Sequence, residues 1–204
     1  MNQRSKRPST SPLIDPALCC LVLIAPTQSD LTCISHKVRT GLRRNLLALI
    51  SAADVMNVPI FLCSPGHHPG DHVFVEHLRR TRHREFTATG HTFAWQNIAF
   101  TEALTHEDRP VLVLAGFWLE HQIVATALHA LADSYEVYIF DATPAQSKPA
   151  VVVCQERLFQ AGVAPVVTSQ IIHEWLLEAP DTHKRAALTE LLARVASSDA
   201  RKSA

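Results

Sequence analysis

The sequence lacks an excess of charge of either sign. Lysine and arginine together number 19, aspartate and glutamate also number 19, and the formal net charge is zero. A balanced chain gives no electrostatic argument for binding to nucleic acid or to an acidic surface. We therefore expect no nucleic-acid partner.

The sequence also lacks long hydrophobic stretches, internal repeats and low-complexity linkers. No stretch approaches the ~20 apolar residues of a membrane span, so we expect no membrane partner. A length of 204 residues fits one domain. We assign residues 1–16 to a mobile N-terminal arm, 17–197 to the domain and 198–204 to a C-terminal tail.

The cysteines lack the even number and regular spacing of a disulfide framework. There are five of them, and several lie in apolar runs: Cys19, Cys20, Cys33, Cys63 and Cys154. This pattern predicts reduced thiols in a reducing compartment, which favours a cytoplasmic protein. The short apolar run at 17–26 could imitate a signal peptide, but prolines interrupt the approach to it, and a buried first strand is the favoured interpretation.

What is present is a series of continuous apolar runs, at 18–24, 58–63, 111–115, 137–140 and 164–168. Such runs are typical of strands that are covered on both faces of a parallel sheet. Segments with helical spacing lie between them, and Gly162 follows the one at 151–161 as a C-terminal cap. Alternating strands and helices predict an α/β fold, a three-layer doubly wound parallel sheet.

One segment resembles a known family. Residues 109–143 begin Arg-Pro-Val-Leu-Val-Leu-Ala-Gly-Phe-Trp-Leu-Glu-His-Gln and end Tyr-Ile-Phe-Asp-Ala-Thr. This resembles the isochorismatase-like cysteine hydrolases, in which a strand ends in Ala-Gly, a Thr-Glu-x-Cys turn carries the nucleophile, and a later strand ends in Asp-Ala. Residues 21–28, 93–97, 156–163 and 173–176 extend the resemblance. It implies the isochorismatase-like hydrolase fold and a homo-oligomer.

The resemblance implies a catalytic cysteine, aspartate and lysine, and this chain departs from the family at all three positions. The cysteine falls on Gln122 and the lysine near Thr89. The aspartate falls on Ala25 or on Pro26, depending on the register chosen. An amide is no nucleophile, and neither a methyl group nor a proline ring accepts a proton. Asp30 is a possible but disfavoured replacement base.

In a doubly wound sheet, ligands bind beyond the carboxyl ends of the strands. This rule and the resemblance give eight candidate pocket residues: Gln28, Trp95, Gly116, Phe117, Trp118, Leu119, Glu120 and His121. Trp95 is also typical of a core or interface anchor. The ligand would be a small molecule.

A histidine-rich stretch offers candidate metal ligands, His67, His68, Asp71 and His72. Imidazoles and a carboxylate can bind zinc or a similar divalent ion, but the fixed spacing of strong zinc motifs is missing, and a polar surface loop is the favoured alternative. The basic run at 78–84 is interpreted as a solvated face or an oligomer contact.

Two functional hypotheses follow. The first is a family member without cysteine-hydrolase activity and without a cofactor, which serves as a binding or assembly subunit. The second is an active hydrolase of a small amide or related substrate that uses relocated chemistry, such as metal-bound water at the 67–72 loop.

Overall fold

The computed structural model describes residues 12–25, 28–65, 78, 81–88, 94–140, 143–145 and 147–200. Its centre is a six-stranded, all-parallel sheet in the order β3-β2-β1-β4-β5-β6. The strands are β1 (Cys19–Ile24), β2 (Ile60–Pro65), β3 (His83–Ala88), β4 (Val111–Gly116), β5 (Glu136–Phe140) and β6 (Ala164–Val166). The strand order reverses between β1 and β4, which makes this junction the topological switch point.

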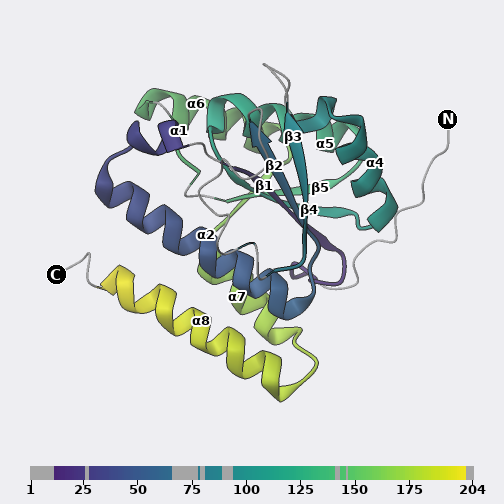
Figure 1. Cartoon of the computed structure of the whole chain (residues 1–204), viewed down its shortest axis with the longest axis vertical. Helices are drawn as coiled ribbons and strands as arrows, with labels where there is room; N and C mark the ends of the chain where they lie inside the picture. Colours follow the sequence, from purple (N-terminus) through teal and green to yellow (C-terminus); the bar gives the residue numbers. More distant parts are fainter. Residues whose placement is uncertain are drawn as a thin grey trace.

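The helices cover both faces of the sheet (Figure 1). They are α1 (Gln28–Thr32), α2 (His36–Met56), α4 (Ile98–Glu107), α5 (Val124–Ala132), α6 (Lys148–Ala161), α7 (Thr168–Leu177) and α8 (Thr182–Ala200), with short turns η1 (Ala94–Gln96) and η2 (Leu119–Ile123). The predicted α/β doubly wound architecture is confirmed. Figure 1 also shows that α8, drawn in yellow, lies outermost and packs on α2 and α7.

Two apolar cores lie on the two faces of the sheet because successive side chains of a strand point in opposite directions. Odd-numbered residues of β1 and β4 join α2, α7 and α8, as Leu21 and Val113 do. Even-numbered residues join α4, α5 and α6, as Val22 and Leu114 do. Every residue of β1 and β4 is buried, which explains why these strands are continuous apolar runs.

Local signals fix several helix ends. The Ser35 hydroxyl accepts the Val38 N–H, and Asn97 Oδ1 accepts the Phe100 N–H at 3.2 Å, as N-caps do. Gly162 ends α6 in the left-handed conformation with φ of 101°, as predicted. Within the described residues, no helix combines the length and the apolar character needed to cross a membrane.

The sequence-based prediction of strands was incomplete at one edge. It gave five strands and interpreted the basic run at 78–84 as a solvated face or an oligomer contact, whereas His83 and Arg84 begin the edge strand β3. Leu78 is buried, and Arg84 forms an ion pair of 2.9 Å with Glu107. An edge strand with one strand neighbour does not require a continuous apolar run, so the pattern missed it.

Two further details concern the domain boundaries that the sequence suggested. Ile14 is buried, and its N–H donates to Glu174 Oε2 at 2.8 Å, so packing begins within the stretch that was assigned to a mobile arm. At the other end, α8 continues to Ala200, beyond the predicted domain end at 197.

Candidate functional site

The switch point brings the ends of β1 and β4 together. Ile24 and Gly116 are paired in register, so the two chains leave the sheet side by side. The Phe117 N–H donates to the Ile24 carbonyl at 3.1 Å, and the Ala25 N–H donates to the Cys63 carbonyl at 2.8 Å. The structure therefore places residues 25 and 116–123 at the edge where the fold predicts a ligand.

Gly116 makes this close approach possible. Its φ is +133°, a conformation that residues with a Cβ rarely adopt. A Cβ added there would lie 2.0 Å from the Ile24 carbonyl oxygen, which belongs to rigid backbone. Glycine is the residue that this position accepts, and it fixes where the following turn begins.

Three backbone N–H groups of the turn after β4 already donate hydrogen bonds within the protein. It follows a cis peptide bond between Phe117 and Trp118 and takes a π-helical form in η2. The Trp118 carbonyl accepts from the N–H groups of His121 (3.2 Å) and Ile123 (3.3 Å), and the Pro144 carbonyl accepts from Leu119 at 3.0 Å. Because the first N–H groups of a helix are those that would hold an oxyanion, these bonds occupy donors that such chemistry needs.

The side chains of η2 point to different surroundings. Gln122 is half-buried and His121 is exposed, while Leu119 and Ile123 belong to the core beneath α4, α5 and α6. Glu120 is half-buried and lies near Cys154 of α6, where its charge contributes to raising the pKa of that thiol after the larger effect of burial. The turn thus carries an amide at Gln122 and an imidazole at His121, and no thiol of its own.

Trp118 anchors the turn to α1. Its indole N–H donates to Asp30 Oδ1 at 2.9 Å, a contact between residues 88 positions apart in the chain. Asp30 was the candidate replacement base. Its carboxylate accepts the indole N–H of Trp118, and this contact positions the turn.

The candidate positions for the acid are only partly described. Ala25 is 1% exposed, and its methyl group packs into the core on the α2 side of the sheet, opposite to the side of Leu119 and Ile123. Pro26 and Thr89 lie outside the described residues. Gln28 begins α1, and its side chain is not described.

Trp95 is the one predicted pocket residue that the structure places away from this turn. Its indole N–H donates to Asp133 Oδ2 at 2.8 Å, and its ring packs edge-on against Tyr135. Asp133 ends α5, eleven residues past Gln122, and a helix rises about 1.5 Å per residue. Trp95 therefore packs at the far end of α5, in keeping with the alternative of a core anchor.

Two polar side chains at the same edge were missed by the sequence-based reasoning. The buried Ser64 hydroxyl at the end of β2 donates to Glu85 Oε1 of β3 at 3.2 Å. Thr143, next to Pro144, is 6% exposed, and its hydroxyl has no hydrogen-bond partner among the described residues. Glu85 could not be found without β3, whereas Thr143 follows the predicted strand at 137–140, and the rule on strand ends could have found it.

The thiols offer no activated nucleophile at this edge. All five cysteines are free, and Cys63, at the end of β2, is the nearest by topology. Burial raises its pKa, and burial also raises the pKa of Cys20 to about 12. A thiol held protonated is a poor nucleophile at neutral pH. Cys33 is exposed on the connection between α1 and α2.

The predicted metal ligands His67, His68, Asp71 and His72 lie outside the described residues. Within the ranges that the structure does describe, no group of three or more histidine, cysteine, aspartate or glutamate side chains could hold a metal ion. The carboxylates and the imidazole of the described edge therefore do not gather into a metal-binding group.

Comparison with solved structures identifies the fold. YcaC from Pseudomonas aeruginosa, solved with hexane-2,5-diol and covalent acrylamide, is 17% identical to this chain, with a TM-score of 0.75 over 97% of this chain and all of YcaC. YcaC from Escherichia coli, described as an octameric hydrolase of unknown specificity, is 18% identical, with a TM-score of 0.72 over 95% of this chain and 99% of its own.

An isochorismatase family protein from Burkholderia thailandensis is 15% identical, with a TM-score of 0.67 over 82% of this chain and 99% of its own. No protein-family model matches the sequence, and the comparison with curated proteins finds no relative. At these identities the likeness concerns the fold. The chain has the isochorismatase-like hydrolase fold over nearly its whole length.

Proposed function

We propose that this chain retains an isochorismatase-like hydrolase fold without cysteine-hydrolase activity and serves as a binding or assembly subunit. The observation that carries the proposal is the turn after β4. The turn contains Gln122, the residue that the sequence resemblance aligns with a cysteine, and the N–H groups of Leu119, His121 and Ile123 already have acceptors within the protein. An amide cannot attack a substrate, and an oxyanion would have to displace existing bonds.

The surrounding thiols and carboxylates support the proposal. The pKa of the Cys63 thiol is raised by burial, and that of Cys154 is raised by burial and by the charge of Glu120. Asp30 accepts the Trp118 indole N–H, and Ala25 offers a buried methyl group. None of these groups forms the nucleophile–base pair within about 3 Å that covalent catalysis requires. We propose a cytoplasmic location, because five cysteines without a disulfide suit a reducing compartment.

The assembly part of the proposal concerns the outer surface of α6. Val152, Val153 and Phe159 are 54%, 63% and 43% exposed, which is unusual for apolar side chains so close together on one helix. One structural neighbour, YcaC of Escherichia coli, is octameric. We propose that α6 contributes to a homo-oligomer, and that Val153→Glu lowers the mass measured by light scattering, whereas Val38→Glu, at an exposed position of α2, leaves it unchanged.

Turnover assays test the catalytic part. Purified protein is incubated with panels of amide and vinyl-ether substrates, and we expect no turnover above that of a heat-inactivated sample. Gln122→Ala is the matched variant, since it removes the amide and leaves the turn. Robust turnover that Gln122→Ala abolishes would overturn the proposal.

A gain-of-reactivity experiment tests the alignment on which the proposal depends. Cys33→Ser removes the exposed thiol, and Gln122→Cys is added to it alone, with Ala25→Asp, or with Pro26→Asp. Acrylamide labelling is followed by peptide mass spectrometry. If the alignment is correct, residue 122 is labelled fastest in one of the two aspartate variants. Equal labelling of all three proteins would show that neither position 25 nor 26 faces residue 122.

A further inference from the structure

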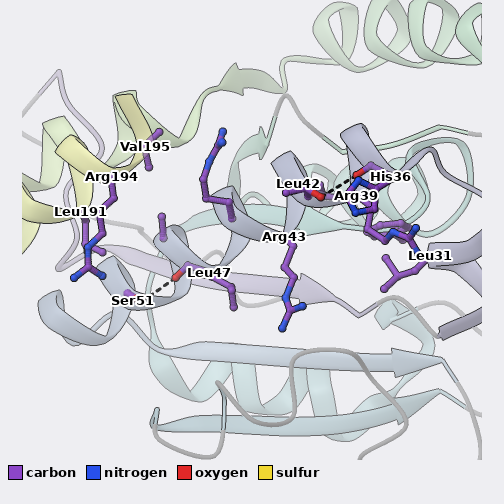
Figure 2. A pocket seen from close by; sticks show the side chains of 14 residues that line it. Leu31, His36, Arg39, Leu42, Arg43, Leu47, Ser51, Leu191, Arg194 and Val195 are labelled. Carbon is purple, nitrogen blue, oxygen red and sulfur yellow. Dashed lines mark hydrogen bonds between the residues drawn. The ribbon is translucent and has the colours of Figure 1, made fainter. Parts of the chain in front are cut away.

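A groove of about 710 Å³ runs along the outer side of α2. Its walls come from α1, α2 and α8, and its floor includes Phe117, the first residue after β4. Figure 2 shows residues of α2 following one another along the groove, from His36 to Ser51, with Leu191 and Val195 of α8 beside the far end. Since Phe117 belongs to the core on the α2 side, the groove and the η2 turn lie on opposite faces of the sheet.

The floor of the groove is apolar and almost entirely aliphatic. It is formed by Leu31, Leu42, Leu47, Phe117, Leu191 and Val195. Leu42, Phe117 and Val195 are 3–4% exposed, so they are fixed by the core behind them. An apolar floor of this size favours an apolar ligand body, because small-molecule sites typically occupy ~300–1,000 Å³ and bury most of the ligand.

The rim of the groove is cationic. Arg39, Arg43 and Arg44 follow one another on the same side of α2, and Arg194 adds a fourth guanidinium from α8. No aspartate or glutamate belongs to the described lining, although the whole chain carries as many acids as bases. The positive charge is therefore a local feature of this groove.

Two of these arginines are available for a ligand. Arg194 forms an ion pair with Glu190, and Arg44 Nε donates to Asn45 Oδ1 at 3.2 Å. The side chains of Arg39 and Arg43 make no hydrogen bond or ion pair with any residue in the described ranges. Figure 2 shows the Arg39 side chain near Leu31, at the end of the groove that α1 closes.

We propose that this groove binds a small aliphatic carboxylate, of the class of a medium-chain fatty acid. Planar guanidinium groups bind carboxylates through paired hydrogen bonds, so Arg39 and Arg43 would hold the head group. The leucine and valine side chains of the floor would cover the tail. The inference goes beyond the proposed function, because it concerns a binding site on the other face of the sheet.

Charge argues against occupants from the chain itself. Residues 1–11 carry Arg4, Lys6 and Arg7, and residues 201–204 carry Arg201 and Lys202, so both ends bring the same sign as the rim. A second copy packed α2 against α2 would place the arginine rims against each other, which is unfavourable. A small anion with an apolar tail is the occupant that satisfies both surfaces of the groove.

Calorimetric titration of the full chain with decanoate, below its micelle concentration, tests the proposal. We expect saturable binding at one site per chain. Decan-1-ol has the same tail without the charge and should bind at least tenfold more weakly, while acetate has the charge without the tail and should show no saturation. Binding of decan-1-ol as tight as that of decanoate would overturn the role of the arginines.

Variants locate the binding. Arg39→Gln combined with Arg43→Gln should weaken decanoate binding at least tenfold, whereas Arg157→Gln, at an exposed site on α6, should leave it unchanged. Thr40→Trp, at an exposed lining position, should block the groove without touching the core. Decanoate binding unchanged by both groove variants, or an oligomer that dissociates when the two arginines are replaced, would overturn the proposal. The readout is binding, so it is independent of any turnover assay.

Discussion

The turn after β4 and the groove along α2 meet at Phe117, which follows β4 and lines the groove, and they differ in how far their polar groups are already bonded. In the turn, three N–H groups have backbone acceptors and the Trp118 indole is bound to Asp30. In the groove, the side chains of Arg39 and Arg43 have no hydrogen-bond or ion-pair partner among the described residues. The described part of the ligand edge is held by internal bonds, whereas the groove in the outer helix layer has two arginine side chains without a partner in the described ranges.

This difference depends on what holds each region in place. The turn is fixed by the sheet itself, because Gly116 contacts Ile24 backbone at the switch point. The groove depends on the position of α8, the outermost helix, which packs on α2 and α7. A change in the turn should therefore affect the whole fold, and a change in the groove should have a local effect.

The largest effect is expected for Gly116→Ala. A methyl group at φ +133° that meets backbone at 2.0 Å combines strain with overpacking, so we expect a loss of about 3 kcal/mol in the free energy of unfolding. Gly162→Ala is the matched control, because φ there is +101° with nothing within 4 Å of the added Cβ, and about 1 kcal/mol is expected. Urea denaturation measures both. Equal losses would show that the turn is not locked by close approach.

The second effect concerns the buried thiol of Cys63 at the edge of the sheet. Burial raises its pKa in the folded protein, so above about pH 8.5 the unfolded chain loses a proton that the folded chain keeps. Stability contributed by the neutral thiol is present below that pH and falls as pH rises, by up to about 1.4 kcal/mol per pH unit.

The contribution of the Cys63 thiol is measured by comparing how steeply the unfolding free energy of each variant falls with pH. Between pH 8.5 and 10.5, the unfolding free energy of Cys63→Ala should fall less steeply with pH than that of the wild type. Cys33→Ala, at the exposed thiol, is the control and should keep the wild-type slope. A Cys63→Ala slope equal to that of the wild type would mean that this thiol ionises in the folded protein, and it would become a candidate nucleophile.

The third effect tests the anchor of the turn. Trp118→Phe removes the indole N–H that binds the partly buried Asp30, and we expect a loss of about 1 kcal/mol. Trp95→Phe removes a similar bond to the exposed Asp133 and should cost about half as much. Both substitutions lose the same ring volume, so the difference reports the environment of the carboxylate. A larger loss at Trp95 would contradict the view that Asp30 positions the turn.

Strands that are buried on both faces could be predicted from the sequence, whereas the edge strand could not. Buried strands such as β1 and β4 are visible as continuous apolar runs, because both faces are covered. The edge strand β3 has Phe86 as its only large apolar side chain, so its sequence carries little signal. With β3 missed, the contact between Glu85 and Ser64 could not be foreseen either.

The sequence predicted where along the chain the candidate site residues lie, but it did not predict which residues they contact. The strand rule and the resemblance gave Gly116 and Phe117 as pocket candidates and Gln122 as the position of the cysteine, and all three lie at or directly after the end of β4. The bond between Trp118 and Asp30 spans 88 positions, and the groove joins α2 to α8 across about 150, distances at which one sequence carries no pairing information. The spacing of Arg39 and Arg43 is helical, but only the position of α8 shows that they border a cavity.

The smallest expected effect has opposite signs at two groove arginines. Arg39 and Arg43 are four residues apart on α2, and like charges at this spacing repel, so Arg43→Gln should stabilise the protein by about 0.3 kcal/mol at low salt. Arg194→Gln instead removes an exposed ion pair with Glu190 and should destabilise it by about 0.3 kcal/mol. Half-molar sodium chloride should reduce both differences, because it screens charges beyond a few ångström. If Arg43→Gln destabilised the protein at low salt, Arg43 would have a bonded partner, and the groove would be as closed as the turn.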